Sequence, residues 1–130
     1  MKRTAMEHSL MVYHKQEIIF QSDGKWLYPL LELTDFLGRN RFNPKDITVH
    51  DKIIGRAAAL LIARLKTGKV IAENLSIAGQ SALEYFRIPY TYKTLLNHIT
   101  CQTEKMLLHE LDPEKAYQLI RDRVKNNPIV

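Results

Sequence analysis

The side chain of Cys101, the one cysteine of the chain, is a candidate nucleophile. The segment from Cys101 to Leu111 is predicted to be a helix, which places the thiol at a helix N-terminus. There the helix dipole favours the thiolate, the nucleophilic form of cysteine. Lys105, one turn later, favours the thiolate further. The alternative is a packing role, because free cysteines are among the most buried residue types.

A second group, Asp51, Lys52 and Arg56, lies at the predicted start of the most regular helix, Asp51 to Leu65. Lys52 could bind an anion or act as a base, with Asp51 as an acid, base or orienting group. Arg56 follows Lys52 by one turn and would share its face, so the two could hold a phosphate or carboxylate. The alternatives are a solvated first-turn pair for Asp51 and Lys52, and a structural ion pair for Arg56.

Ser76 and Glu104 complete the candidate ligand-binding residues, and each also has a structural reading. Ser76 precedes a predicted helix, Ile77 to Phe86, and is suited to cap it. Glu104 is three residues after Cys101 and could close a capping box there.

Hydrophobic periodicity predicts four strands and five helices along the chain. A hairpin of strands at Ser9 to His14 and Glu17 to Gln21 comes first, and further strands follow at 69–72 and 90–96. Helices are predicted at 29–37, 51–65, 77–86, 101–111 and 113–125, and the second of these is expected to be central and buried. The order predicts an α/β fold with a mixed sheet and an N-terminal β-hairpin.

The remaining segments are expected to be loops or tails. Residues 1–8 and 127–130 are predicted as flexible tails around a single domain of residues 9–126. The polar segment Gly38 to Lys45 is either a mobile lid over a site or an ordinary surface loop.

Composition is that of an ordinary globular domain, with 45% hydrophobic and 25% charged residues in 130. No apolar stretch is long enough for a signal peptide or a membrane span, so we expect a cytoplasmic protein without membrane contact. The net charge of +5 and the pI of about 9.4 favour nucleic acid as a partner, but the basic residues are scattered along the sequence. Nucleic-acid binding therefore ranks last among the functions considered. The oligomeric state does not follow from the sequence.

The stretch DKIIGRAAALL, Asp51 to Leu61, resembles the core motif of the family called domain of unknown function 1893. Pro29-Leu30-Leu31 after the hairpin, Ser81-Ala82-Leu83-Glu84 before an aromatic strand, and Cys101-x-x-Glu104-Lys105 resemble that family in order and spacing. The resemblance covers roughly residues 9–124. It implies a cytidine deaminase-like fold, a three-layer α/β/α sandwich, with a cleft where the helices begin. Asp51, Lys52, Ser76 and Cys101 would line that cleft.

The zinc chemistry of deaminases is not expected. Zinc deaminases use His-x-Glu at one helix start and Pro-Cys-x-x-Cys at the next. Here the first segment reads His50-Asp51-Lys52, with lysine in place of glutamate, and Ser76-Ile77-Ala78-Gly79 contains no cysteine. We therefore expect neither a metal nor another cofactor.

Three functions remain open. The first is a pocket that binds a small anionic metabolite or nucleotide through Lys52, Arg56, Ser76 and Glu104. The second is a small-molecule enzyme with Cys101 as nucleophile or carrier, assisted by Asp51 and Lys52. The third is nucleic-acid binding.

Overall fold

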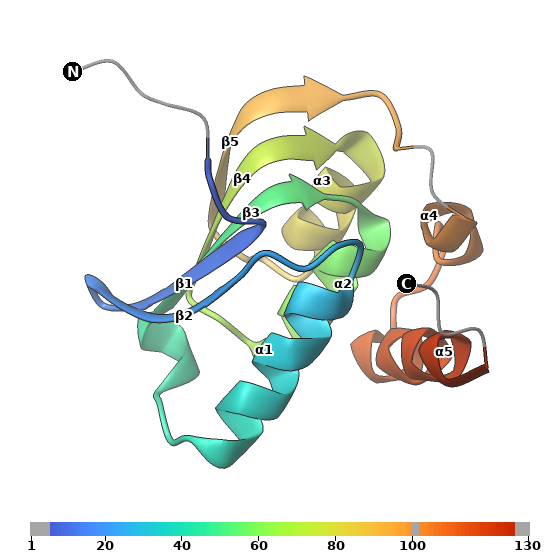
Figure 1. The fold of residues 1–130 in the computed structure, drawn as a ribbon. Helices are drawn as coiled ribbons and strands as arrows, with labels where there is room; N and C mark the ends of the chain where they lie inside the picture. The colour runs from blue at the N-terminus through green and yellow to red at the C-terminus, as the bar shows by residue number, and fades with distance from the viewer. Residues whose placement is uncertain (1–5, 100–101, 127–130) are drawn as a thin grey trace.

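The protein is built on a five-stranded mixed sheet with the strand order β2-β1-β3-β4-β5 (Figure 1). The computed structural model describes residues 6–99 and 102–126. The strands are β1 (Leu10–His14), β2 (Glu17–Ser22), β3 (Ile47–Ile54), β4 (Lys69–Ser76) and β5 (Tyr90–Leu96). β1 runs antiparallel to β2 and β3, whereas β3, β4 and β5 are parallel. The predicted α/β class with a mixed sheet and a leading hairpin is confirmed.

The helices lie over one face of this sheet (Figure 1). They are α1 (Tyr28–Arg39), α2 (Arg56–Leu65), α3 (Ile77–Tyr85), α4 (Gln102–Met106) and α5 (Pro113–Asn126), and a short 3-10 helix, η1, spans Pro44–Asp46. The crossovers from β3 to β4 and from β4 to β5 advance in the same direction across the sheet. Because such crossovers are right-handed, α2 and α3 cover the same face.

The opposite face of the sheet is only partly buried. Met11, Tyr13 and Ile71 on that face are half-buried, and Thr91 on the edge strand β5, which pairs with Ile71, is exposed. In the described part of the chain no helix covers it, so the expected three-layer sandwich is not formed there. α5 instead packs on α2, as a second helical tier on the same side.

The helix expected from Asp51 to Leu65 begins later, because residues 47–54 form the central strand β3. Ile47 and Val49 are buried and alternate with half-buried Thr48 and His50, as in a strand with one covered face. Gly55 separates the strand from α2. The prediction was wrong here because Asp51 was interpreted as an acidic residue of a helix first turn.

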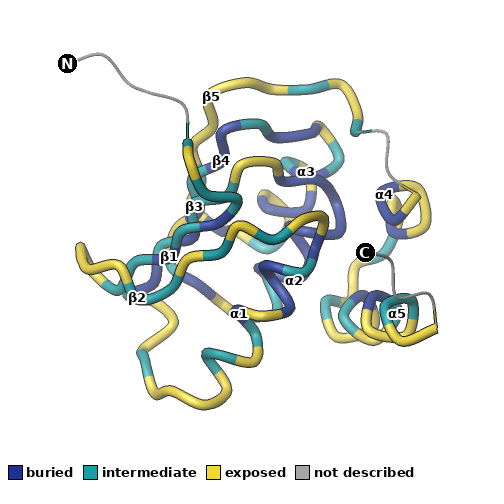
Figure 2. The backbone as a smooth tube through the Cα atoms, in the orientation of Figure 1, coloured by how far each residue is buried: buried dark blue, intermediate teal, exposed yellow. Residues whose placement is uncertain are grey.

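The centre of the core is α2, as predicted. All residues from Arg56 to Ile62 are buried, and Figure 2 shows most of this helix in dark blue. The small side chains of Ala57, Ala58 and Ala59 allow neighbouring elements to approach α2 closely. The elements α1, α3, α4 and α5 all contact it.

The other boundaries follow the predictions with some changes. The hairpin turns at Lys15, which has a left-handed φ of 60°. β4 continues to Ser76, and the helix expected over 101–111 spans Gln102–Met106. The predicted tail 127–130 and most of the tail 1–8 lie outside the described residues. No described helix has the length and hydropathy needed to cross a membrane.

The segment Gly38 to Lys45 does not lie beside a site at the carboxyl ends of the strands. Gly38 and Arg39 end α1, and Pro44 begins the turn of η1 that leads into β3. This segment therefore lies at the amino end of β3, at the opposite end of the strand from the expected cleft.

Substitutions at Gly68 and Gly38 test how closely Gly68 packs against the backbone of Lys45. A Cβ on Gly68 would overlap the backbone carbonyl of Lys45, whereas a Cβ on Gly38 would have no atom within 4 Å. We expect Gly68→Ala to lower the free energy of unfolding by about 2 kcal/mol, as overpacking against backbone does. Gly38→Ala, in a helix, should raise it by about 0.5–1 kcal/mol. Urea unfolding of both variants checks this, and equal effects would contradict the close contact at Gly68.

Candidate functional site

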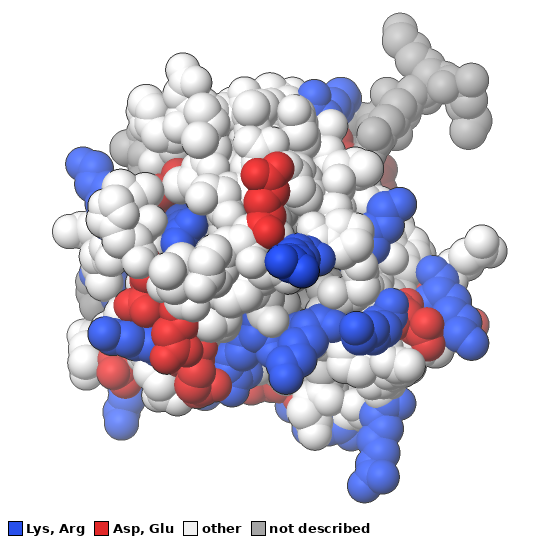
Figure 3. Space-filling model, turned by 180° about the vertical axis from the view of Figure 1, so that it is seen from behind, with Lys and Arg blue, Asp and Glu red and all other residues white. Residues whose placement is uncertain are grey.

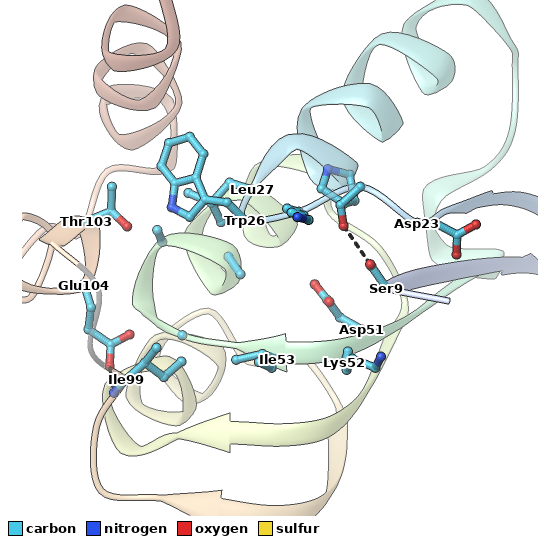
Figure 4. Close-up of a pocket in the computed structure, with 16 residues that line it drawn as sticks. Ser9, Asp23, Trp26, Leu27, Asp51, Lys52, Ile53, Ile99, Thr103 and Glu104 are labelled. Atoms are coloured by element: carbon cyan, nitrogen blue, oxygen red, sulfur yellow. Dashed lines mark hydrogen bonds between the residues drawn. The ribbon is translucent and has the colours of Figure 1, made fainter. Parts of the chain in front are cut away.

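A cavity of about 550 Å³ opens at the carboxyl end of β3. It lies between that strand, the loop that leads into α1, the start of α2 and the segment before α4 (Figure 4). Its walls are mainly apolar and come from Trp26, Leu27, Pro29, Ile53, Ala57, Ala58 and Ile99. Its charged lining residues are Asp23, Lys25, Asp51, Lys52 and Glu104. A cavity of this size and composition is typical of small-molecule sites.

Asp51 supplies the carboxyl group of this cavity. It lies in β3 between Leu10 of β1 and Ala72 of β4, and its side chain points into the cavity (Figure 4). Burial raises the pKa of Asp51 from 3.8 to about 7, although hydrogen bonds from the backbone of Ile53 and Lys52 act in the opposite direction. Near neutral pH this carboxyl group can therefore both donate and accept a proton.

Lys52 also lines the cavity, but not in the arrangement predicted. It lies in β3, where its backbone N–H donates to the Ser9 carbonyl at 3.0 Å. Its side chain is exposed. Since Lys52 precedes α2, the expected pair of Lys52 and Arg56 on one helix face is not formed.

Arg56 points away from the cavity, into the packing between α2 and the C-terminal helices. Its guanidinium donates to the carbonyls of Leu107 at 3.0 Å, Glu110 at 2.6 Å and Ala78 at 3.4 Å. Burial lowers the Arg56 pKa, and the charges of Glu104 and Glu110 oppose that change. The protein itself thus uses the donors that were predicted to bind a ligand anion.

Glu104 brings a carboxylate to the start of α2. It is buried and accepts hydrogen bonds from the backbone N–H of Arg56 at 2.7 Å and from the Ser76 hydroxyl at 3.3 Å. A side chain on Gly55 would collide with this carboxylate. The helix N-terminus expected to attract a ligand anion is therefore occupied by an anion of the chain itself.

Ser76 has the structural role considered for it. Its hydroxyl accepts a hydrogen bond from the Gly79 N–H at 2.9 Å and so caps α3, and the side chain is fully buried. Ser76 does not line the cavity. Cys101 lies outside the described residues, so its proposed role as nucleophile stays a prediction.

Trp26 is the main cavity residue that sequence reasoning missed. It is 42% exposed and has a left-handed φ of 56°. Trp26 and Leu27 lie across the cavity from Asp51 and Ile53 (Figure 4). The sequence feature that could have identified Trp26 is its position, because the one tryptophan of the chain follows the turn residues Asp23 and Gly24.

His50, the histidine at the position of the deaminase motif, contacts a glutamate instead. Its Nε2 lies 2.7 Å from Oε2 of Glu73 on the neighbouring strand β4. His50 and Asp51 are consecutive in a strand and point to opposite faces. Among residues 6–99 and 102–126, no three histidine, cysteine, aspartate or glutamate side chains are grouped as metal ligands would be.

The family comparison and the structural comparison agree on one family. The family model described as domain of unknown function DUF1893 matches residues 2–124. The crystal structure of a DUF1893 family protein from Thermotoga maritima is similar, with a TM-score of 0.80 and 25% sequence identity. The match covers 90% of this chain and 81% of that one. None of the curated proteins matches the chain.

Proposed function

Because the chain belongs to the DUF1893 family, whose description names no activity, we propose from the cavity itself that it binds a small ring-bearing metabolite. The observation that carries this proposal is the Asp51 carboxyl group, with a pKa of about 7, inside a largely apolar cavity. A buried carboxyl group without a salt bridge to stabilise its charge is costly for folding and is often found at functional sites.

The lining favours a flat ring with hydroxyl or amino groups. Trp26 and Leu27 offer an aromatic and an aliphatic surface for the ring, and Ile53 lies opposite. A hydroxyl or amino group of the ligand would donate to Asp51. A nucleoside has this combination of groups and suits a cavity of about 550 Å³.

This ligand differs from the anionic one expected from the sequence. Glu104 occupies the start of α2, Ser76 caps α3 and Arg56 is bound to backbone carbonyls. An anionic group of the ligand, such as the phosphate of a nucleotide, would instead lie outside, near the exposed Lys25 at the cavity.

A relation to the cytidine deaminase-like fold remains part of the proposal, although helices cover only one face of the sheet in the described residues (Figure 1). It is supported by the sequence resemblance, by the hairpin followed by two parallel crossovers, and by the position of the cavity at the strand ends where α2 begins. The proposed function does not require zinc.

The intrinsic fluorescence of Trp26 tests this function directly, because it is the single tryptophan and lies at the cavity. Titration with adenosine, uridine, their monophosphates and ribose should change the emission for at least one nucleoside. Ionised Asp51 accepts a stronger hydrogen bond than the protonated acid, so affinity should rise about tenfold between about pH 6 and about pH 8.

Asp51→Asn should remove most of this pH dependence and weaken binding about tenfold, the usual loss of one hydrogen bond to a charged group. Asp35→Asn, on an exposed position of α1, is the matched control and should bind as the unmodified protein does. If no compound changes the emission, or if both variants bind alike, the cavity is not the proposed site.

A further inference from the structure

Basic side chains line the opposite, amino-terminal edge of the sheet. Lys15 is in the turn between β1 and β2, Lys45 precedes β3, Lys66 and Lys69 flank the turn into β4, and Arg87 precedes β5. Because the spatial order is β1-β3-β4-β5, these residues follow one another along the edge. Residues far apart in the sequence thus form a row, which we call the basic edge.

Backbone hydrogen bonds between successive turns hold this order. Lys15 N–H donates to the Asp46 carbonyl at 2.8 Å, and Gly68 N–H donates to the Ile47 carbonyl at 3.0 Å. Val70 N–H donates to the Pro89 carbonyl at 2.9 Å. With neighbouring strands about 4.8 Å apart, the row across four strands is about 14 Å long.

The basic edge includes a hollow. A depression of about 1050 Å³ is lined by Lys45, Arg64, Lys66 and Arg87, with Phe86, Ile88 and Pro89 as its apolar part. The carboxylates at its border already have partners. Glu114 accepts from Arg64 at 2.7 Å, and Asp112 accepts from the backbone N–H of Glu114 at 3.0 Å.

The cations of the row are free to meet a ligand. All five are exposed, and in the described part of the chain none of them is within ion-pair distance of a carboxylate. Figure 3 shows many Lys and Arg side chains across the lower part of one face of the molecule, with Asp and Glu side chains among them on both sides. Tyr85, 58% exposed, packs edge-to-face on Phe86 at 4.9 Å, next to Arg87 in the chain.

From this arrangement we infer that the basic edge binds single-stranded nucleic acid. A line of separate cations matches the repeated phosphates of a strand better than one compact phosphate group. The apolar part of the hollow and the exposed ring of Tyr85 offer surfaces for sugars and for a stacked base, as in single-strand binding proteins. This site goes beyond the proposed metabolite cavity, which lies at the other end of the strands, and either can exist without the other.

The test is fluorescence anisotropy of the full chain with a labelled oligouridylate over a series of salt concentrations. Three or four phosphate contacts predict a slope of log affinity against log salt of about −2 to −3. The variant Lys45→Glu, Lys66→Glu, Arg87→Glu should bind at least about tenfold more weakly at low salt and flatten the slope by about 2.

A matched control reverses three equally exposed lysines elsewhere, Lys93→Glu, Lys105→Glu and Lys125→Glu, and changes the net charge equally. It should keep most of the affinity and of the slope. Circular dichroism checks folding, and Lys45→Ala with Arg87→Ala replaces the triple variant if that variant does not fold.

Three results would overturn the inference. The first is the absence of binding at low salt, and the second is an equal loss in both charge-reversal variants, which would show diffuse attraction. The third is equally tight binding of polyglutamate or of duplex DNA, which would identify a different polyanion as the partner.

Discussion

Asp51→Asn should stabilise the folded protein at alkaline pH by about 2–4 kcal/mol. The carboxyl pKa is 3.8 in the unfolded chain and about 7 in the folded protein, so the folded state binds the proton more tightly. The penalty for ionising Asp51 is therefore absent below about pH 4, grows as pH rises, and is complete above about pH 7. Asparagine has the same shape but no ionisation, and so does not carry this penalty.

Urea unfolding of the protein and of Asp51→Asn, at intervals from about pH 4 to about pH 9, measures this effect. The two stability curves should converge at the acidic end and separate toward the alkaline end. The exposed control Asp35→Asn should stay parallel to the unmodified protein. A difference of constant size at every pH would contradict the raised pKa.

The second large effect is expected at Arg56. Arg56→Ala should lower the free energy of unfolding by about 2–4 kcal/mol, because the buried guanidinium, which interacts with the charges of Glu104 and Glu110, is lost. The carbonyls of Leu107 and Glu110 would also lose their donors. Since a domain of this kind is stable by about 5–15 kcal/mol, the variant should be close to unfolding.

Arg64→Ala is the matched control for this change. Arg64 lies on the same helix, but its partner Glu114 is exposed and its guanidinium stacks on Tyr117 at 3.8 Å. An exposed ion pair and a surface stacking contact together contribute about 1–2 kcal/mol. Urea unfolding of both variants at neutral pH compares them. If Arg56→Ala costs no more than Arg64→Ala, the buried carbonyl contacts do not hold the C-terminal helices.

Local sequence patterns predicted the elements that have a clear periodicity and an ordinary end signal. The hairpin at Lys15, the buried body of α2 and the cap at Ser76 are examples. The pattern failed at β3, because an aspartate in a central strand is unusual and Asp51 resembles the first-turn acid of a helix. Asp51 is also the residue that places a carboxyl group in the cavity. The wrongly predicted segment therefore contains part of the candidate site.

The remaining parts depend on contacts between distant segments. Glu104 caps α2 from 48 positions away, and neither residue alone indicates that contact. The basic edge is likewise invisible in the sequence, where its cations are scattered, and forms only through the strand order. Arg56 and Lys52 were assigned to one helix face because the strand end at Gly55 was missed.

The position of α2 between the sheet and α5 has a consequence for the folding of this chain during its synthesis. The outer side of α2 is apolar, and Ala116 and Ile120 of α5 belong to the same buried core. At typical elongation rates, the roughly sixty residues from the end of α2 to the end of α5 take about 3–12 s to be made. Throughout that interval α5 does not yet cover the apolar outer side of α2, so the nascent chain exposes a surface prone to aggregation.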